Sequence, residues 1–260
     1  MLLENKTAVI YGAGGAIGTA VARAFASEGA RLFLAGRTRG TVEAAARVVR
    51  ESGGAVQVAE VDAADETSVE RHVADVLATA GRIDVMFNAL GMLDVQGTPL
   101  LDMSFEDFAQ PVAVATRTQF VTARTVARHM ATRGAGVIMT VTAEPTIAPD
   151  LGGFPVACAA VEAMWRGFAV ELGPSGVRTV VIRTPGSPDS PAVQDVYRLH
   201  TGRPEVTVDA IQAEWGGNTA MSRLPLLAEI ADAATLFASD RASAMTATLA
   251  NVTCGAHIDM

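Results

Sequence analysis

A strand-like run, Thr7–Tyr11, passes directly into a glycine cluster and then into an alanine-rich helical pattern. The cluster comprises Gly12, Gly14, Gly15 and Gly18. Where a buried strand turns straight into a helix, the N–H groups of the first helical turn point into the gap, and the helix dipole favours an anion there. Glycines let the backbone approach a pyrophosphate closely and let the helix pack against the strand. The feature therefore predicts a dinucleotide site, with a purely structural tight loop as the alternative.

Short β-branched runs and alanine-rich helical stretches alternate along the whole chain. The expected strands are Thr7–Tyr11, Arg31–Ala35, Ala55–Val61, Ile83–Ala89, Gly136–Thr142, Val177–Arg183 and Thr248–Thr253. The expected helices are Ala16–Glu28, Thr41–Ser52, Thr67–Ala80, Ser104–Ala131, Phe154–Leu172 and Leu227–Ala238. This alternation predicts an α/β fold, in which a doubly wound parallel sheet carries helices on both faces. Because no internal repeat or linker divides the chain, we expect a single domain over residues 1–260.

The composition argues against several classes of function. Half of the 260 residues are hydrophobic and the formal net charge is −8, so we expect no nucleic-acid partner. The N-terminus shows no targeting pattern, and no run approaches the roughly 18 apolar residues of a membrane span. Cys158 and Cys254 are far apart and outside any metal-ligand spacing, while His72, His129 and His257 look like surface or terminal residues without a partner. We therefore expect a cytoplasmic protein with no membrane and no metal.

The end of the second expected strand bears on the choice of nucleotide. An NAD site usually has an acidic residue about 20 residues past the glycines, where it binds the ribose 2′-hydroxyl. This chain has Gly36 there, followed by Arg37 and Arg39. A small residue leaves room for a 2′-phosphate and arginines can pair with it, so we expect NADP(H) rather than NAD(H), with solvated surface arginines as the alternative. Asp62 is a candidate acceptor for the adenine amino group, although it or Asp65 could instead cap the next helix.

Several motifs together resemble the short-chain dehydrogenase/reductase family over nearly the whole chain. The glycine turn is similar to that family's Thr-Gly-x-x-x-Gly-x-Gly, with Tyr11 for the threonine and Ala16 for the middle glycine. The Asn-Ala-Leu-Gly run at 88–91 is similar to its Asn-Asn-Ala-Gly. The Pro-Gly pair at 185–186 matches the turn after its sixth strand, and residues 171–178 are close to its usual run into that strand.

The resemblance implies a Rossmann-type sheet of about seven strands in the order 3-2-1-4-5-6-7 and a nicotinamide dinucleotide as cofactor. It also implies that the helices at 104–131 and 154–172, which are apolar around much of their circumference, pair across a two-fold axis into a homodimer or homotetramer. With the glycine turn and the arginines, the expected cofactor-binding residues are Gly12, Gly14, Gly15, Ala16, Ile17, Gly18, Arg37, Thr38, Arg39, Asp62, Ala63, Asn88, Ala89, Leu90, Gly91, Pro185, Gly186, Ser187 and Ser190.

The catalytic residues of that family are missing from this chain. The family uses a tyrosine to transfer the proton, a lysine one helical turn later, a serine on the fifth strand and a helical asparagine. The corresponding positions hold Phe154, Cys158, Ala143 and Ala115. Ketone reduction by the family's mechanism is therefore disfavoured, whereas hydride transfer to an iminium or an activated C=C stays open, because such acceptors need little protonation.

A long stretch rich in proline, glycine and polar residues, about 184–226, is expected to form a lid or substrate loop. Within it, Tyr197 and His200 lie three residues apart and would share one face of a helix. They are the candidate catalytic residues, as proton donors or substrate contacts, with packing or solvent exposure as the alternative. Strand alternation directs Thr142 and Glu144 away from the side of position 143.

Two functions therefore fit the sequence. One is an NADP(H)-dependent oxidoreductase with an unconventional active site, acting on an activated C=C, an imine or a carbonyl. The other is a non-catalytic NADP(H)-binding protein, such as a sensor or a partner subunit. The missing catalytic residues favour the second function, and the long lid favours the first.

Overall fold

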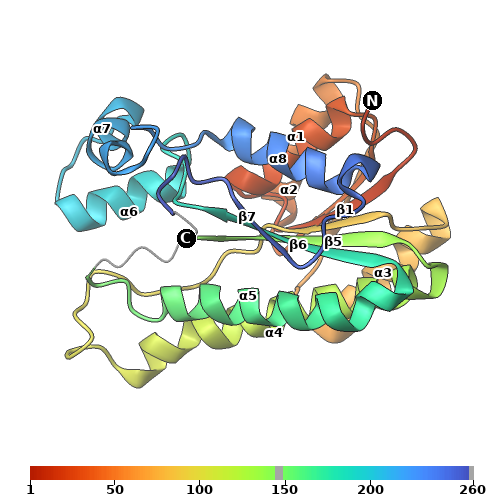
Figure 1. Ribbon diagram of the computed structural model, residues 1–260, viewed down its shortest axis with the longest axis horizontal. Coiled ribbons are helices and arrows are strands. Elements are labelled where there is room, and N and C mark those ends of the chain that lie inside the picture. Colours follow the sequence, from red (N-terminus) through yellow and green to blue (C-terminus); the bar gives the residue numbers. More distant parts are fainter. Residues whose placement is uncertain (144–148, 258–260) are drawn as a thin grey trace.

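One parallel sheet of seven strands forms the centre of the structure, a computed structural model that describes residues 1–143 and 149–257 (Figure 1). The strands lie in the order β3-β2-β1-β4-β5-β6-β7. Their bounds are β1 Thr7–Tyr11, β2 Arg31–Gly36, β3 Val56–Glu60, β4 Val85–Asn88, β5 Gly136–Ala143, β6 Val177–Thr184 and β7 Thr248–Asn251. The order confirms the predicted Rossmann-type topology.

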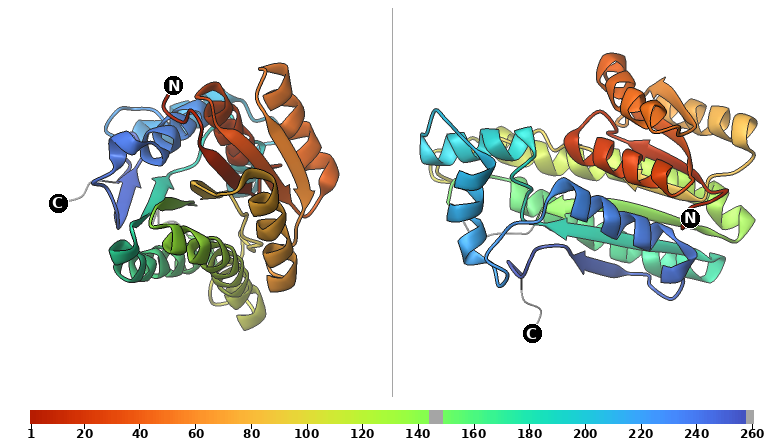
Figure 2. Two further views of the ribbon diagram at one scale, coloured as in Figure 1. Left: turned by 90° about the vertical axis from the view of Figure 1, so that its right-hand side faces the viewer. Right: turned by 90° about the horizontal axis from the view of Figure 1, so that it is seen from above.

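Helices cover both faces of this sheet (Figure 2). Their bounds are α1 Ala16–Ser27, α2 Arg39–Glu51, α3 Glu66–Ala80, α4 Phe105–Arg133, α5 Phe154–Leu172, α6 Pro191–Thr201, α7 Val208–Glu214 and α8 Leu227–Ala238. Single 3₁₀ turns lie at Gly173–Ser175, Gly216–Asn218 and Asp240–Ala242. Helices α1, α2 and α8 cover one face, and α3, α4 and α5 cover the other.

Consecutive side chains of a central strand enter two different hydrophobic cores. Ile10 of β1 packs in the core that includes Phe25 of α1 and Ile230 of α8. Its neighbour Val9 packs in the opposite core, with Val73 of α3. Side chains alternate in this way because successive residues of a strand point to opposite faces. Since both faces are filled, a ligand can enter only where strands end, and β1 and β4 mark the point at which the strand order reverses.

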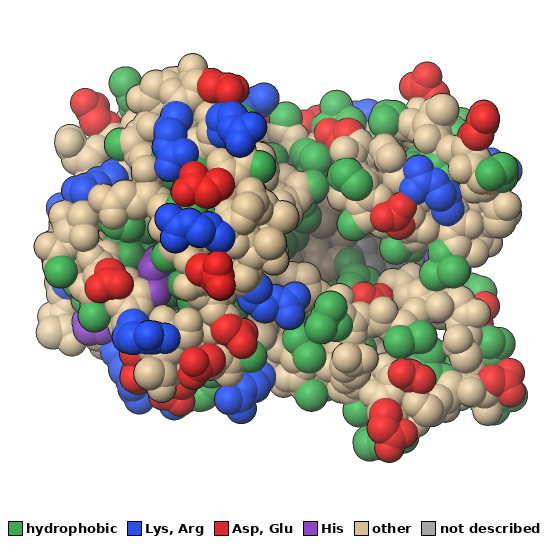
Figure 3. Space-filling view, turned by 180° about the vertical axis from the view of Figure 1, so that it is seen from behind, with side chains coloured by type: hydrophobic (Ala, Val, Ile, Leu, Met, Phe, Trp, Pro, Cys, Tyr) green, Lys and Arg blue, Asp and Glu red, His purple; other side chains and the backbone are tan. Residues whose placement is uncertain are grey.

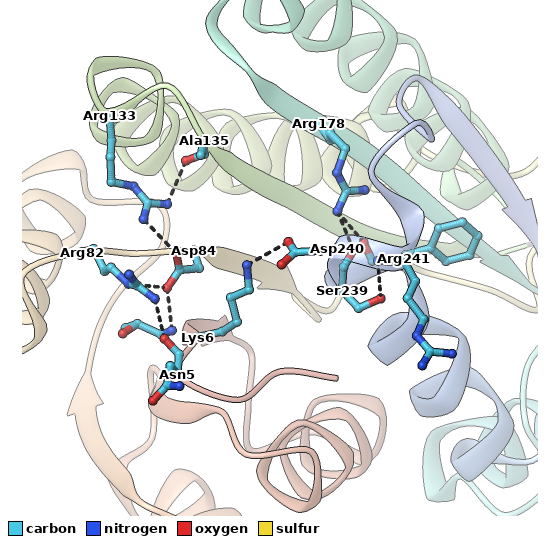
Figure 4. Close-up of polar contacts among 12 residues, drawn as sticks. Asn5, Lys6, Arg82, Asp84, Arg133, Ala135, Arg178, Ser239, Asp240 and Arg241 are labelled. Atoms are coloured by element: carbon cyan, nitrogen blue, oxygen red, sulfur yellow. Dashed lines mark hydrogen bonds and ion pairs between the residues drawn. The ribbon is translucent and has the colours of Figure 1, made fainter. Parts of the chain in front are cut away.

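Polar side chains tie the N-terminal ends of the strands together (Figure 4). Asp84, just before β4, accepts hydrogen bonds from Arg82 Nε at 3.0 Å, from Arg133 Nη1 at 2.8 Å and from the Thr7 amide at 2.8 Å. Nearby, the Lys6 ammonium pairs with an Asp240 carboxylate oxygen at 2.8 Å. These contacts occupy polar groups at the N-terminal edge of the sheet, opposite the C-terminal edge where open parallel sheets bind their ligands.

His72 departs from the sequence-based expectation of a surface residue. Its side chain is only 5% exposed, and Nδ1 lies 3.1 Å from the Tyr11 hydroxyl. Burial lowers the pKa of His72 to about 4, although the nearby Asp75 carboxylate opposes that shift. The expectation is wrong because the partner of His72 lies on β1, 61 residues away along the chain.

Candidate active site

The glycine turn after β1 is sterically obligatory. Gly12 has φ +75°, and a Cβ there would overlap the carbonyl oxygen of Ala89. A Cβ on Gly18 would lie 2.5 Å from the Gly12 carbonyl oxygen, and one on Gly14 would lie 2.5 Å from Thr41 Oγ1. Gly15 is the N-cap of α1, and no side chain caps the first turn. The amide groups at the start of α1 are therefore free of a side-chain acceptor beside a tight backbone, which suits a pyrophosphate.

The end of β4 lies directly beside this turn. The Ala89 amide donates to the Tyr11 carbonyl oxygen at 2.8 Å, which fixes residues 88–91 next to Gly12. Asn88 is fully buried, and its Nδ2 donates to Gln119 Oε1 and Thr122 Oγ1, both at 2.8 Å. These hydrogen bonds to α4 hold the Asn-Ala-Leu-Gly run in place.

The expected adenine side is open. Arg37, Thr38 and Arg39 are all exposed after β2, and Arg39 Nη2 lies 3.9 Å from Glu43 Oε1. Asp65 is the N-cap of α3, accepting from the Thr67 amide at 3.0 Å. Asp65 is therefore the residue that caps the helix after β3.

Asp62 makes a local turn next to that cap. Its Oδ1 accepts a hydrogen bond from the Ala64 amide at 3.0 Å, and its own amide donates to Ser68 Oγ at 3.3 Å. The turn holds Asp62 and the neighbouring Ala63 at the C-terminal end of β3, where the sequence places an adenine contact.

The loop after β6 carries a buried hydroxyl that forms no hydrogen bond within the described chain. Gly186 has φ +98°, and its amide donates to Thr184 Oγ1 at 3.3 Å. Ser187 is 2% exposed, and its Oγ has no hydrogen-bond partner among the described residues. Ser190 is the N-cap of α6 but caps it with no side-chain hydrogen bond. A buried unpaired hydroxyl carries a desolvation cost that a bound ligand can remove.

The four positions that correspond to the family's catalytic residues form an apolar patch. Ala115 and Cys158 are 2% and 1% exposed, Ala143 ends β5 and Phe154 begins α5. Cys158 Sγ lies 4.0 Å from Met92 Sδ. Burial raises the pKa of the Cys158 thiol to about 11, so the thiol is protonated at neutral pH.

One turn beyond Cys158, a buried ion pair lies on the same side of α5. Arg183 of β6 donates to Glu162 through Nε at 3.1 Å and through Nη2 at 2.8 Å. Thr142 of β5 also donates to Glu162 Oε1, at 3.0 Å. The pair joins α5 to the ends of β5 and β6, and sequence reasoning missed it. Its signal was an acid in the apolar middle of a helix and a base near the end of an apolar strand.

Within the segment predicted to form a lid, Tyr197 packs inward. Its side chain is fully buried, its hydroxyl donates to Glu214 Oε2 at 2.6 Å and receives a hydrogen bond from Arg203 Nη1 at 2.5 Å. The hydrogen bond to Glu214 is the main reason that the pKa of Tyr197 is raised. Tyr197 also meets Trp215 edge to face, with ring centroids 5.1 Å apart. Helices α6 and α7 therefore share a small core of their own.

His200 points elsewhere, toward the loop between β4 and α4. Its Nε2 lies 3.0 Å from Gln96 Oε1, and Leu199 packs against Gly97 of the same loop. Tyr197 and His200 both lie on α6, as the spacing predicts, but they have different partners, because Tyr197 packs against α7 while His200 reaches across to Gln96. Thr142 is directed to Glu162, as noted above, and Glu144 lies outside the described residues.

The segment predicted to form a lid and the N-terminal ends of α4 and α5 border a hollow. Figure 3 shows it from behind, with hydrophobic side chains on both sides of the opening. The Gly97 amide donates to the Asp150 carbonyl oxygen at 2.8 Å, which joins the β4–α4 loop to the segment before α5. The glycine turn, the apolar patch and the lid thus meet at one end of the sheet.

Comparison with known proteins decides the family. A family model described as enoyl-(acyl carrier protein) reductase matches residues 12–257. The chain belongs to the short-chain dehydrogenase/reductase family. It is 29% identical to an uncharacterized oxidoreductase, YxbG, of Bacillus subtilis over 246 residues, which cover 94% of this chain and 88% of that protein.

Solved structures of the short-chain dehydrogenase/reductase family agree in fold. A putative member from Burkholderia xenovorans is 28% identical, with a TM-score of 0.83 and 99% of both chains covered. An NAD⁺-bound xylitol dehydrogenase is 24% identical, with a TM-score of 0.89 over 99% of this chain and 100% of that chain. In the described part of this chain, no helix could cross a membrane, and no three His, Cys, Asp or Glu residues gather as metal ligands would.

Proposed function

We propose that this protein is an NADP(H)-dependent oxidoreductase whose active site departs from the family's usual one. The main support is that a glycine turn suited to a dinucleotide occurs together with apolar residues at the four positions where the family has its catalytic residues. Relatives named as oxidoreductases support turnover over a purely binding role. When bound, the cofactor would supply or accept a hydride at its nicotinamide ring.

The chain's own residues fit such a cofactor. The uncapped start of α1 and the tight approach at Gly12 suit the pyrophosphate, and the buried Ser187 hydroxyl offers a hydrogen bond on the nicotinamide side. Arg37 and Arg39, both exposed, would pair with the 2′-phosphate of NADP(H).

Titration of NADPH and NADH by nicotinamide fluorescence tests the cofactor. Arg37→Ala should weaken NADPH binding by roughly 1.5–3 kcal/mol, because a hydrogen bond to a charged group is lost. NADH binding should change little. Arg47→Ala is the matched control, since Arg47 is an exposed arginine farther along α2. Equal affinities for the two nucleotides, unchanged by Arg37→Ala, would contradict the choice of NADP(H).

We further propose that the acceptor needs little protonation or takes its proton from the lid. Among Ala115, Ala143, Phe154 and Cys158, only the Cys158 thiol carries an acidic proton, and its raised pKa of about 11 makes it a weak proton donor at neutral pH. Of the two lid candidates, His200 is the exposed one at the edge of the β4–α4 loop, whereas the Tyr197 hydroxyl is engaged by Glu214 and Arg203.

A panel of ketones, imines and enones with NADPH, followed at 340 nm, tests this chemistry. A positioned acid contributes about 10²- to 10⁴-fold, so His200→Ala or Tyr197→Phe should lower turnover at least tenfold if that residue acts. Cys158→Ala is the control and should change little. Brisk ketone reduction that survives both lid changes would refute the proposal. Silence across the panel with tight NADPH binding would identify a non-catalytic NADP(H)-binding protein.

We also propose that two copies pair through α4 and α5. Phe120 of α4 stacks on Phe168 of α5 at 5.9 Å while remaining 42% exposed, and Val170 is 78% exposed. An aromatic and aliphatic face of this kind on adjacent helices suits a second copy of the same face, related by a two-fold axis.

A further inference from the structure

Asp94 lies in the β4–α4 loop at the mouth of the site. The loop is held against α5 by the contact between Met92 and Cys158, and Asp94 follows two residues later. Asp94 is half-buried, and among the described residues no lysine or arginine forms an ion pair with it. Its Oδ2 accepts a hydrogen bond from Gln96 Nε2 at 2.5 Å, which leaves Oδ1 without a donor in the described chain.

The charge of Asp94 reaches the apolar patch. Burial is the main cause of the raised pKa of Cys158, and the carboxylates of Glu162 and Asp94 raise it further. Glu162 is neutralised by Arg183, whereas Asp94 has no such cation. Among the described residues, Asp94 is therefore a negative charge without an ion-pair partner close to Cys158.

An aromatic residue lies one helical turn from Cys158 on α5. Phe154 begins α5, one turn before Cys158, and is partly exposed. The face of an aromatic ring attracts a cation, and it does so more strongly where water is excluded. A carboxylate and an aromatic residue, both close to Cys158, are the combination that recognises an organic cation.

We propose that the substrate carries a positive charge at the carbon that accepts the hydride, as an iminium ion does, with Asp94 as its counter-charge and Phe154 as its aromatic wall. The inference rests on the proposed function, whose site it shares. His200 then acts through Gln96, since the chain His200–Gln96–Asp94 orients the carboxylate.

The reaction balances without an acid in the site. The hydride brings an electron pair from the dihydronicotinamide to the iminium carbon and forms a C–H bond. The C=N π pair moves to nitrogen, the product is a neutral amine, and the nucleotide leaves oxidised. No proton is taken up in this step, which agrees with the apolar residues at the four catalytic positions.

Binding of a cation that cannot be reduced tests the site independently of turnover. We would titrate N,N-dimethyl-1,2,3,4-tetrahydroisoquinolinium into the full chain with NADP⁺ present, and its uncharged carbon analogue as the reference. Wild type should bind the cation at least tenfold more tightly than the analogue. Asp94→Asn should lose about tenfold, equivalent to about 1.4 kcal/mol, and Phe154→Leu about threefold. Asp102→Asn is the matched control, because Asp102 is an exposed carboxylate of the same loop, and it should bind as wild type does.

Turnover gives a second readout. N-methyl-3,4-dihydroisoquinolinium should be reduced by NADPH, and Asp94→Asn should raise KM about tenfold with kcat nearly unchanged, because the charge is lost as the hydride arrives. Equal affinity for the cation and its uncharged analogue, or equal losses in Asp94→Asn and Asp102→Asn, would overturn the inference. Cation binding that depends on Asp94 without any NADPH binding would uphold the cation site and refute the proposed function. Tight NADPH binding without cation binding would refute the cation site and leave the proposed function standing.

Discussion

Removing Glu162 should destabilise the protein strongly, because it breaks a buried ion pair by taking away its carboxylate. The side chains of Glu162 and Arg183 are 8% and 7% exposed. In Glu162→Ala, Arg183 loses acceptors at 3.1 and 2.8 Å and the Thr142 hydroxyl loses one at 3.0 Å. Breaking a buried ion pair costs about 3–5 kcal/mol. At roughly 2–4 °C per kcal/mol for a domain of this size, the melting temperature should fall by roughly 6–20 °C.

Urea unfolding followed by far-UV circular dichroism, at one fixed protein concentration, measures the loss. Asp195→Ala is the control, because its ion pair with Arg198 is largely exposed and should contribute at most about 1 kcal/mol. Changing both Glu162 and Arg183 to methionine should lower the free energy of unfolding less than Glu162→Ala does, since the double change removes both charges and keeps a similar side-chain volume. If Glu162→Ala costs no more than Asp195→Ala, the reasoning from burial is refuted.

Two further predictions concern acid stability and assembly. Burial lowers the pKa of His72 to about 4, below its unfolded value of about 6.5, so the stability it contributes is complete above pH 6.5 and lost as the pH falls toward 4. Wild type should therefore lose roughly 3 kcal/mol more than His72→Phe between pH 7 and pH 4 in urea unfolding, and parallel pH profiles would contradict this. In light scattering at micromolar concentration, wild type should exceed the 26.9 kDa monomer mass, and Val170→Glu should shift it toward monomer; a monomeric wild type would exclude the α4–α5 pairing.

The sheet could be predicted because its determinants are local. Runs such as Thr7–Tyr11 and Val177–Thr184 need burial on both faces, and each is followed or preceded by a helix pattern within a few residues. The glycine turn was predictable for the same reason: Gly18 meets Gly12, six residues away. Strand ends were harder to predict. β4 is shorter at both ends than its apolar run suggests, because the Asp84 carboxylate accepts from the Thr7 amide before the strand and the Ala89 amide donates to Tyr11 after it.

The polar contacts of the site were not predictable, because each joins residues that no short pattern relates. Glu162 meets Arg183 over 21 residues and Tyr197 meets Glu214 over 17. The spacing of Tyr197 and His200 describes only the helix they share, whereas their roles depend on what packs against each side of it. A small core with α7 takes one residue, and the β4–α4 loop takes the other. A charged residue inside an apolar segment still demands a partner. Glu162 and Arg183 are therefore the residues from which sequence reasoning could have begun to build the interior of this site.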